Sequence, residues 1–142
     1  MSKVSLTKEI EQLNQKDFYS VIADYEKYPE FISEIKKAVW VSKKPRRVEF
    51  ELELVKKFHY ILEFLEKSPE EISWKLIESN LFKKNSGSWK IKKKGNLLSV
   101  TYALDVEFGF LVPSFVVDKM VKKDLPKMIE QFSKRTENLY GA

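Results

Sequence analysis

Residues 46–67 read RRVEFELELVKKFHYILEFLEK, and their pattern of apolar and polar residues indicates the type of fold. In its first half apolar residues alternate with glutamate, and in its second half apolar residues again recur at every other position. Successive side chains of a strand point to opposite faces of a sheet, so this period of two predicts strands with one apolar and one wet face. We expect them at 46–56 and 57–67, in an antiparallel sheet.

Other extended segments surround this pair. The same alternation, broken by turn-forming residues, predicts further strands at 36–43, 71–80, 83–94 and 97–108. The expected turns lie at Lys44-Pro45, Ser68-Pro69, Asn85-Ser86-Gly87 and Gly95-Asn96. Alternation from Val4 to Ile10 adds a first strand, which brings the expected sheet to seven strands.

Two short helices are expected after the first strand. Asn14 supplies a capping oxygen for an amphipathic helix of about three turns. Its apolar face is Phe18, Val21, Ile22 and Tyr25. Pro29 disfavours helical dihedrals at the residue before it and suits the first turn of a new helix, so we expect the second helix to begin there. The apolar residues expected on that helix are Phe31, Ile32 and Ile35.

A long helix is expected at the C-terminal end, from Ser114 as N-cap to Leu139. Its apolar stripe is Val117, Val121, Leu125, Met128 and Phe132, with Met120 and Ile129 beside it. Pro126 removes a backbone hydrogen bond and predicts a bend there, or a restart of the helix capped by Asp124.

These elements predict an α+β fold in which a curved antiparallel sheet wraps around the long helix. With 142 residues, of which 43% are hydrophobic, the chain can bury one core but not two, so we expect a single domain at 1–142. The inward face of the sheet is rich in aromatic residues. Those residues can either line an open cavity or fill a solid core, and the pattern allows both.

Composition excludes several classes of chemistry. The chain contains no cysteine, which removes disulfides, thiolate nucleophiles and the common zinc frameworks. We expect no metal and no other cofactor. His59, the one histidine, falls on the outward parity of its strand, so we assign no catalytic residue. The first eight residues lack an apolar segment of the secretory type, and we expect a cytoplasmic protein.

The net charge of +5 permits an anionic partner. Lysines cluster along one expected strand: Lys83, Lys84, Lys90, Lys92, Lys93 and Lys94. They suit the phosphates of a membrane or a ribosome, or they simply keep a sheet edge soluble. We expect no binding to DNA, and a monomer or weak dimer.

Three motifs resemble those of one family. Residues 21–31, VIADYEKYPEF, resemble the helix-loop-helix signature of the START-like polyketide cyclase and lipid-transport superfamily. Residues 81–89, LFKKNSGSW, resemble the Phe-containing turn and Gly-x-Trp strand of its branch with the mitochondrial coenzyme Q-binding proteins and the ribosome-association toxin RatA. Residues 132–135, FSKR, and 139–141, LYG, resemble the Phe-x-x-Arg and Tyr-Gly motifs at the C-terminal end of that branch. Asn80 and Leu81 stand where this branch usually has Gly-Pro.

The resemblance implies a helix-grip fold whose cavity binds a quinone, a lipid or a polyketide-like ring system. The residues expected to contact this molecule are Phe31, Tyr60, Trp74, Trp89, Tyr102, Val117, Met120, Val121, Leu125 and Met128. Flat aromatic rings stack on polycycles, and methionine adapts to ligands of varied shape.

The leading functional hypothesis is therefore non-enzymatic binding or transport of a hydrophobic small molecule. Two alternatives follow from the same resemblance. One is an aromatic polyketide cyclase or dehydratase, which would need a charged or polar catalytic group inside the cavity. The other is a RatA-like protein that associates with ribosomes through its lysines, in which case binding would weaken steeply with salt.

Overall fold

The computed structural model describes residues 2–141, apart from the side chains of Ser2 and Val4. Seven strands and several helical segments follow one another along the chain. The strands are β1 (Ser2–Glu11), β2 (Ile35–Lys43), β3 (Arg46–Glu53), β4 (Lys57–Lys67), β5 (Glu71–Ser79), β6 (Phe82–Lys94) and β7 (Leu97–Phe108). The N-terminal helices are α1 (Gln15–Ala23) and the 3₁₀ helix η1 (Tyr25–Glu30).

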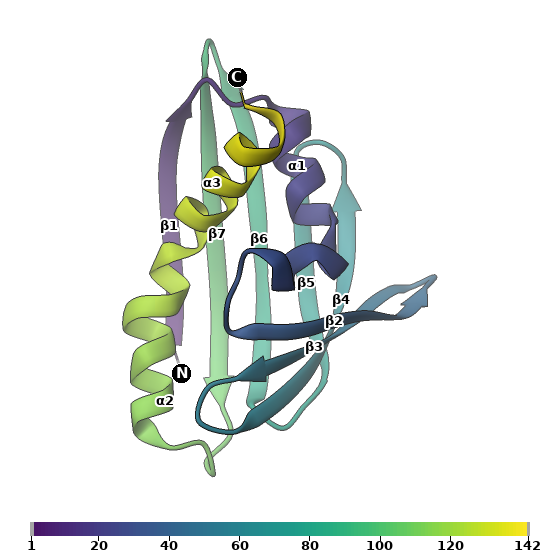
Figure 1. Ribbon diagram of the computed structural model, residues 1–142, viewed down its shortest axis with the longest axis vertical. Coiled ribbons are helices and arrows are strands. Elements are labelled where there is room, and N and C mark those ends of the chain that lie inside the picture. The colour runs from purple at the N-terminus through teal and green to yellow at the C-terminus, as the bar shows by residue number, and fades with distance from the viewer. Residues whose placement is uncertain (1, 142) are drawn as a thin grey trace.

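All seven strands form one antiparallel sheet in the order β1-β7-β6-β5-β4-β3-β2. The sheet curls so strongly that β2 and β3 run across the direction of β1, β6 and β7 (Figure 1). The C-terminal helical stretch lies over the concave face along β1, β7 and β6. The predicted α+β fold, a curved seven-stranded sheet wrapped around a long helix, is confirmed.

The C-terminal stretch contains four helical segments. They are α2 (Ser114–Lys119), the π-helical turn η2 (Met120–Asp124), the 3₁₀ turn η3 (Leu125–Lys127) and α3 (Met128–Tyr140). Pro126 lies in η3, so the helix is interrupted at this proline, as predicted. Two predicted caps are wrong: Pro113 holds the N-cap position in place of Ser114, and Asp124 makes no capping hydrogen bond.

The π turn changes which residues face the sheet. A π turn takes more residues than an α turn, so the inward positions step by five across it, from Met120 to Leu125. The buried residues of the stretch are Val116, Met120, Leu125, Ile129, Phe132 and Thr136. The predicted stripe through Val117 and Val121 is therefore wrong in the first half of the helix, where both valines are only half-buried.

The second helix lies earlier than predicted. η1 spans Tyr25–Glu30 and contains Pro29 in its last turn, whereas the prediction began the helix at this proline. The fixed φ of proline suits a 3₁₀ turn as well as an α helix. The carbonyl of Tyr28 then accepts from the N–H groups of Phe31 and Ile32 at 3.2 and 2.9 Å, which ends the helix. Ile35 already begins β2.

The turn predicted at 85–87 is wrong, because β6 runs through it without a break. Gly87 is paired with Trp74 of β5, and a Cβ atom at this glycine would lie 2.3 Å from the Ala103 carbonyl oxygen and 2.6 Å from the Trp74 ring. The glycine thus serves close packing in a strand rather than a change of chain direction.

Among residues 2–141, no helix combines the length and apolar character that a membrane span requires.

Candidate ligand-binding cavity

A cavity of about 290 Å³ lies between the concave face of the sheet and the C-terminal helix. Its apolar lining comes from η1 and the segment after it, from the sheet and the turn after β3, and from the helix: Tyr28, Ile32, Ile35, Phe50, Leu52, Leu54, Tyr60, Leu62, Phe64, Trp74, Phe82, Trp89, Tyr102, Leu104, Met120, Leu125, Met128 and Phe132. Its polar lining is Ser33, Glu34, Asn85, Asp124, Lys127 and Gln131. The inward aromatic residues therefore surround a cavity and do not fill the interior completely.

Aromatic rings form much of the cavity wall. The rings of Phe50 and Tyr60 stack with their centroids 5.2 Å apart, and Trp74 stacks on Tyr102 at 5.9 Å. Trp89 lies 4.6 Å from Tyr102 and is almost fully buried. Tyr60 and Trp74 point inward yet keep part of their surface accessible, as expected of side chains that border a cavity.

Three neutral polar groups face this apolar surface. The hydroxyls of Tyr60 and Tyr102 have no hydrogen-bond partner within the described part of the chain. Burial raises the pKa of both phenols above the ordinary 10.0, so both stay protonated and able to donate. Asn85 is also buried, and its Oδ1 accepts a 3.0 Å hydrogen bond from Nε1 of Trp74. The Nδ2 group of Asn85 then remains as a donor.

Asn85 was missed by the sequence prediction, which placed it in a turn. The signal that could have identified it is its position: it lies within a 12-residue segment of strand character, at the same parity as Trp89 and Ile91. A polar residue at a buried strand position usually has a specific hydrogen-bonding role.

Charged residues lie at the cavity's edge. Nζ of Lys119 is 3.6 Å from Glu34 and 3.3 Å from Asp124, so one lysine joins the segment before β2 to the helix. Burial lowers the pKa of Lys119, but the hydrogen bonds and charges of the two carboxylates outweigh it and hold this pKa above its usual range. Asp124 thus lines the cavity and pairs with Lys119, in place of its predicted capping role.

Most of the residues predicted to contact a ligand come together here. Those in the cavity lining are Tyr60, Trp74, Trp89, Tyr102, Met120, Leu125 and Met128. The π turn rotates Val117 and Val121 out of the lining. Phe31 also lies outside it, because its ring packs on Phe132 at 5.0 Å, beneath the guanidinium of Arg135.

The family-like motifs join distant parts of the chain. Phe132 of α3 packs edge-on against Tyr28 of η1 at 5.2 Å. One turn later, Arg135 donates a 2.7 Å hydrogen bond to Glu30 and lies 5.2 Å from the ring of Phe31. The 132–135 motif therefore fastens the last helix to the Tyr-Pro-Glu-Phe segment beside the cavity.

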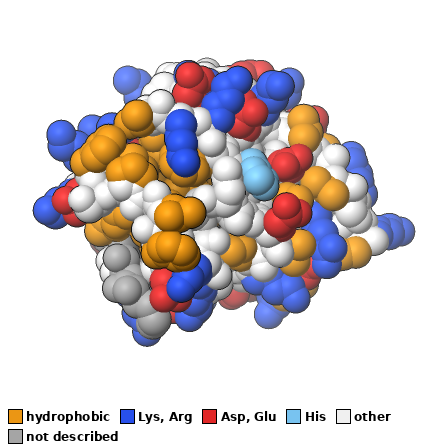
Figure 2. All heavy atoms as spheres, turned by 90° about the horizontal axis from the view of Figure 1, so that it is seen from below, with side chains coloured by type: hydrophobic (Ala, Val, Ile, Leu, Met, Phe, Trp, Pro, Cys, Tyr) orange, Lys and Arg blue, Asp and Glu red, His pale blue; other side chains and the backbone are white. Residues whose placement is uncertain are grey.

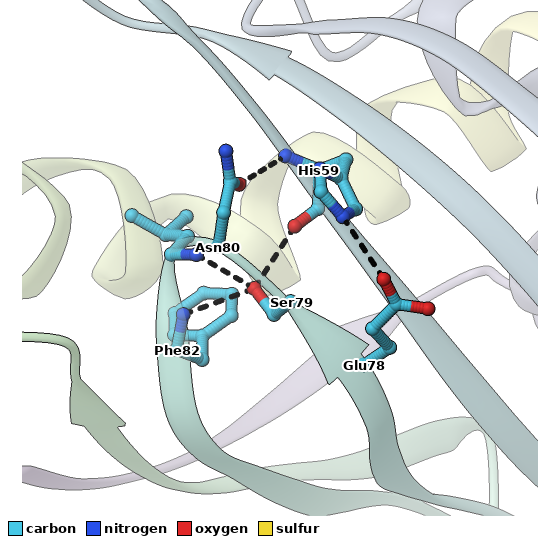
Figure 3. Close-up of polar contacts among 6 residues, drawn as sticks. His59, Glu78, Ser79, Asn80 and Phe82 are labelled. Carbon is cyan, nitrogen blue, oxygen red and sulfur yellow. Dashed lines mark hydrogen bonds and ion pairs between the residues drawn. The ribbon is translucent and has the colours of Figure 1, made fainter.

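His59 is not among the residues that line this cavity, and Figure 3 shows its polar contacts with Glu78, Ser79 and Asn80. Its ring is partly exposed on β4 and its Nε2 lies 3.6 Å from Glu78. Its backbone N–H donates to Asn80 at 2.8 Å and its carbonyl accepts from Ser79 at 2.9 Å. These contacts hold the connection between β5 and β6, and they place the histidine on the outward side, as its parity predicted.

A curved antiparallel sheet that holds a C-terminal helix over an apolar cavity defines the START-like class of proteins. This chain belongs to the polyketide cyclase / dehydrase and lipid transport family, whose model matches residues 13–133. No curated protein sequence is significantly similar to it.

Solved structures share the fold over nearly the whole chain. A START superfamily protein from Mycobacterium smegmatis is 23% identical with a TM-score of 0.80, covering 96% of this chain and 98% of its own. A protein from Thermus thermophilus is 18% identical with a TM-score of 0.76, covering 96% and 95%. Zhui aromatase/cyclase from Streptomyces sp. R1128 is 13% identical with a TM-score of 0.67, covering 95% and 86%. At these identities the likeness concerns the fold alone.

Proposed function

We propose that this protein binds a hydrophobic small molecule in the cavity between sheet and helix and releases it unchanged. The observation that carries this proposal is the lining itself, in which aromatic and aliphatic side chains surround a space of about 290 Å³. Such a lining with a few convergent polar groups is typical of a ligand site. Within residues 2–141 the deepest polar groups are neutral, so they suit recognition better than proton transfer.

The polar groups indicate what the molecule carries. Tyr60, Tyr102 and the Nδ2 group of Asn85 can all donate hydrogen bonds into the cavity. A ligand with a neutral acceptor such as a quinone, ketone or ester oxygen would satisfy them. An apolar body attached to that oxygen would stack on Trp74 and the neighbouring rings. We therefore propose a quinone, a lipid ester or a polyketide-like ring as the ligand class.

Burial of the apolar body supplies enough free energy for useful affinity. Burying about 400 Å² of apolar surface gains about 10 kcal/mol at about 25 cal/mol per Å². Lost translational and rotational freedom offsets part of this, which leaves micromolar binding within reach. No ion pair with the ligand is needed.

The first test is native mass spectrometry of the purified protein, followed by organic extraction of whatever co-purifies. Trp74 and Trp89 line the cavity and Trp40 does not, so quenching of tryptophan fluorescence by a short-chain quinone gives a second readout. A stoichiometric adduct, or saturable quenching that a Leu104→Phe substitution in the lining weakens without adding a fluorophore of its own, would support the proposal. A protein that carries no adduct and takes up no quinone, lipid or polycycle would refute it.

A second candidate is a cyclase or dehydratase of aromatic polyketides. The presence of Asp124 and Glu34 in the cavity lining favours it, since both are potential proton acceptors. Dehydration would release one water, so a polyketide analogue incubated with the protein should lose that mass at a rate that Asp124→Asn reduces. If the analogue binds but is recovered unchanged, the protein is not a dehydratase and ligand binding remains as its function.

A further inference from the structure

An apolar loop lies at the end of the molecule where β7 passes into α2. Phe110 is 86% exposed, Leu111 78% and Phe115 58%. We refer to these three residues as the apolar tip. The turn between β3 and β4 lies at the same end of the molecule (Figure 1), and Val55 in this turn is 69% exposed. Single exposed apolar residues are common, but three within six positions form a patch that folding does not explain.

The backbone of this loop is held in place. The N–H of Gly109 donates to the carbonyl of Leu81 at 2.9 Å, and the N–H of Val112 donates to the carbonyl of Gly109 at 3.1 Å. Val112 packs against the core and Val116 is buried in it. The loop therefore presents Phe110 and Leu111 to solvent from an ordered backbone.

Four lysines lie on the segments that flank the apolar tip and the turn of Val55. Lys122 and Lys123 follow the apolar tip on the same helical stretch, Lys56 lies in the turn that carries Val55, and Lys57 begins β4 directly after that turn. These four lysines are exposed and form no ion pair with any residue in 2–141. Figure 2 views this end and shows its largest group of apolar side chains on the left, with basic side chains around the outline and acidic side chains among them.

We propose that the apolar tip and these four lysines dock the protein on an anionic membrane surface. Phenylalanine and leucine gain free energy by entering the boundary between headgroups and acyl chains, and each nearby lysine adds attraction to anionic lipid. The four lysines outnumber Glu53 and Asp118, the exposed acids of the same segments, so an anionic lipid surface fits this end better than a second copy of this chain. This docking goes beyond ligand binding and does not depend on it.

Docking at this end would bring the cavity to the lipid. The stretch that carries the apolar tip continues into Met120 and Asp124, which line the cavity, and Lys119 joins it to Glu34 at the cavity's edge. A hydrophobic ligand could then pass between bilayer and cavity with little exposure to water.

Flotation with lipid vesicles tests the proposal. The whole chain is mixed with vesicles of phosphatidylcholine alone, or with about one-third phosphatidylglycerol. We expect it to float with the anionic vesicles only, and Phe110→Ser with Leu111→Ser, or Lys122→Glu with Lys123→Glu, to weaken binding about tenfold or more. The matched control is Leu139→Ser with Tyr140→Ser, at 51% and 53% exposure near the C-terminal end, which should bind as wild type.

Four outcomes would overturn the proposal. The first is no flotation of the wild-type protein with anionic vesicles. The second is equal loss in the 110/111 and 139/140 variants, which would mean nonspecific adhesion. The third is a wild-type dimer in sedimentation that the 110/111 variant converts to a monomer, which would identify a contact between copies. The fourth is binding to a single-stranded RNA, lost in the 122/123 variant, without vesicle binding. Cavity binding of a water-soluble quinone should remain in every variant, so failure of docking and failure of ligand binding are distinguishable.

Discussion

Nε1 of Trp74 donates a 3.0 Å hydrogen bond to Oδ1 of Asn85, and both residues line the cavity. The bond joins neighbouring strands, and the paired position opposite Trp74 is Gly87. It satisfies the indole N–H inside an apolar wall and orients the amide so that its Nδ2 group remains a donor. The Trp74 ring, the Asn85 amide and Gly87 therefore hold β5 and β6 together and also shape the cavity wall.

Replacing Asn85 by leucine should destabilise the protein by about 1–3 kcal/mol, because the Trp74 N–H would remain buried without a partner. Ligand affinity should fall as well, since a cavity donor is lost. Urea unfolding and fluorescence titration measure the two effects. The double variant Trp74→Phe with Asn85→Leu removes both partners and should recover part of the lost stability. If the double variant loses the sum of both single changes, the bond contributes nothing.

Gly87→Ala should lower the free energy of unfolding by about 3 kcal/mol or more. The new Cβ would lie 2.3 Å from the Ala103 carbonyl oxygen, which can move only if the backbone of β7 moves with it. Gly109→Ala is the matched control. The nearest atoms to a Cβ there are 3.7 and 3.9 Å away, so its stability should stay near wild type. Equal melting temperatures for the two variants would contradict the close approach of β6 to Trp74 and β7.

Removing the hydroxyls of Tyr60 and Tyr102 should reduce ligand affinity by about threefold to tenfold each without loss of stability, because neither bonds to the protein. Tyr25→Phe should do the reverse. The Tyr25 hydroxyl donates to Glu66 at 2.6 Å outside the cavity lining, so its loss should cost about 2 kcal/mol and leave affinity unchanged. Titration and urea unfolding of all three variants test this separation, and a loss of stability in Tyr60→Phe would contradict it.

Stability should fall at alkaline pH. Burial, with the nearby charge of Glu66, raises the pKa of Tyr19 from 10.0 to about 12. The unfolded chain would release this proton from about pH 10, while the folded protein keeps it. The stabilisation is therefore complete below pH 10 and is lost as the pH rises towards 12. Melting temperatures from pH 8 to 11.5 measure the effect, and Tyr19→Phe should show a shallower decline.

Tyr19→Phe should also be at least as stable as wild type near neutral pH. The Tyr19 hydroxyl is buried without a hydrogen-bond partner in the described structure, so its removal relieves an unsatisfied polar group. A marked loss of stability in urea unfolding would indicate that a water molecule bridges this hydroxyl to its surroundings.

The strands could be predicted because their signal is local. Alternation of apolar and polar residues fixed the side-chain parity of β3, which buries Val48, Phe50 and Leu52 as expected. Asn14 likewise caps α1, with its side chain accepting from two backbone N–H groups at 2.9 and 3.2 Å. The candidate cavity residues on the sheet, from Tyr60 to Tyr102, follow from the same parity, and all of them lie in the lining.

The residues that could not be predicted depend on contacts between distant segments. Asn and Gly favour turns locally, but Asn85 and Gly87 occupy a strand because Trp74 requires a hydrogen-bond acceptor and space beside it. Phe31 leaves the cavity because Arg135, distant in sequence, packs over its ring.

Periodicity and composition act over short stretches of chain, so they were enough to predict the class of fold, the inward face of the sheet and the aromatic character of the interior. The π turn at Met120–Asp124, which buries Val116 and Met120 in place of Val117 and Val121, depends on how the helix packs on the sheet. That packing also leaves the interior open. A helix and a curved sheet each satisfy their own hydrogen bonds first, and the space left between them depends on how these two rigid surfaces meet.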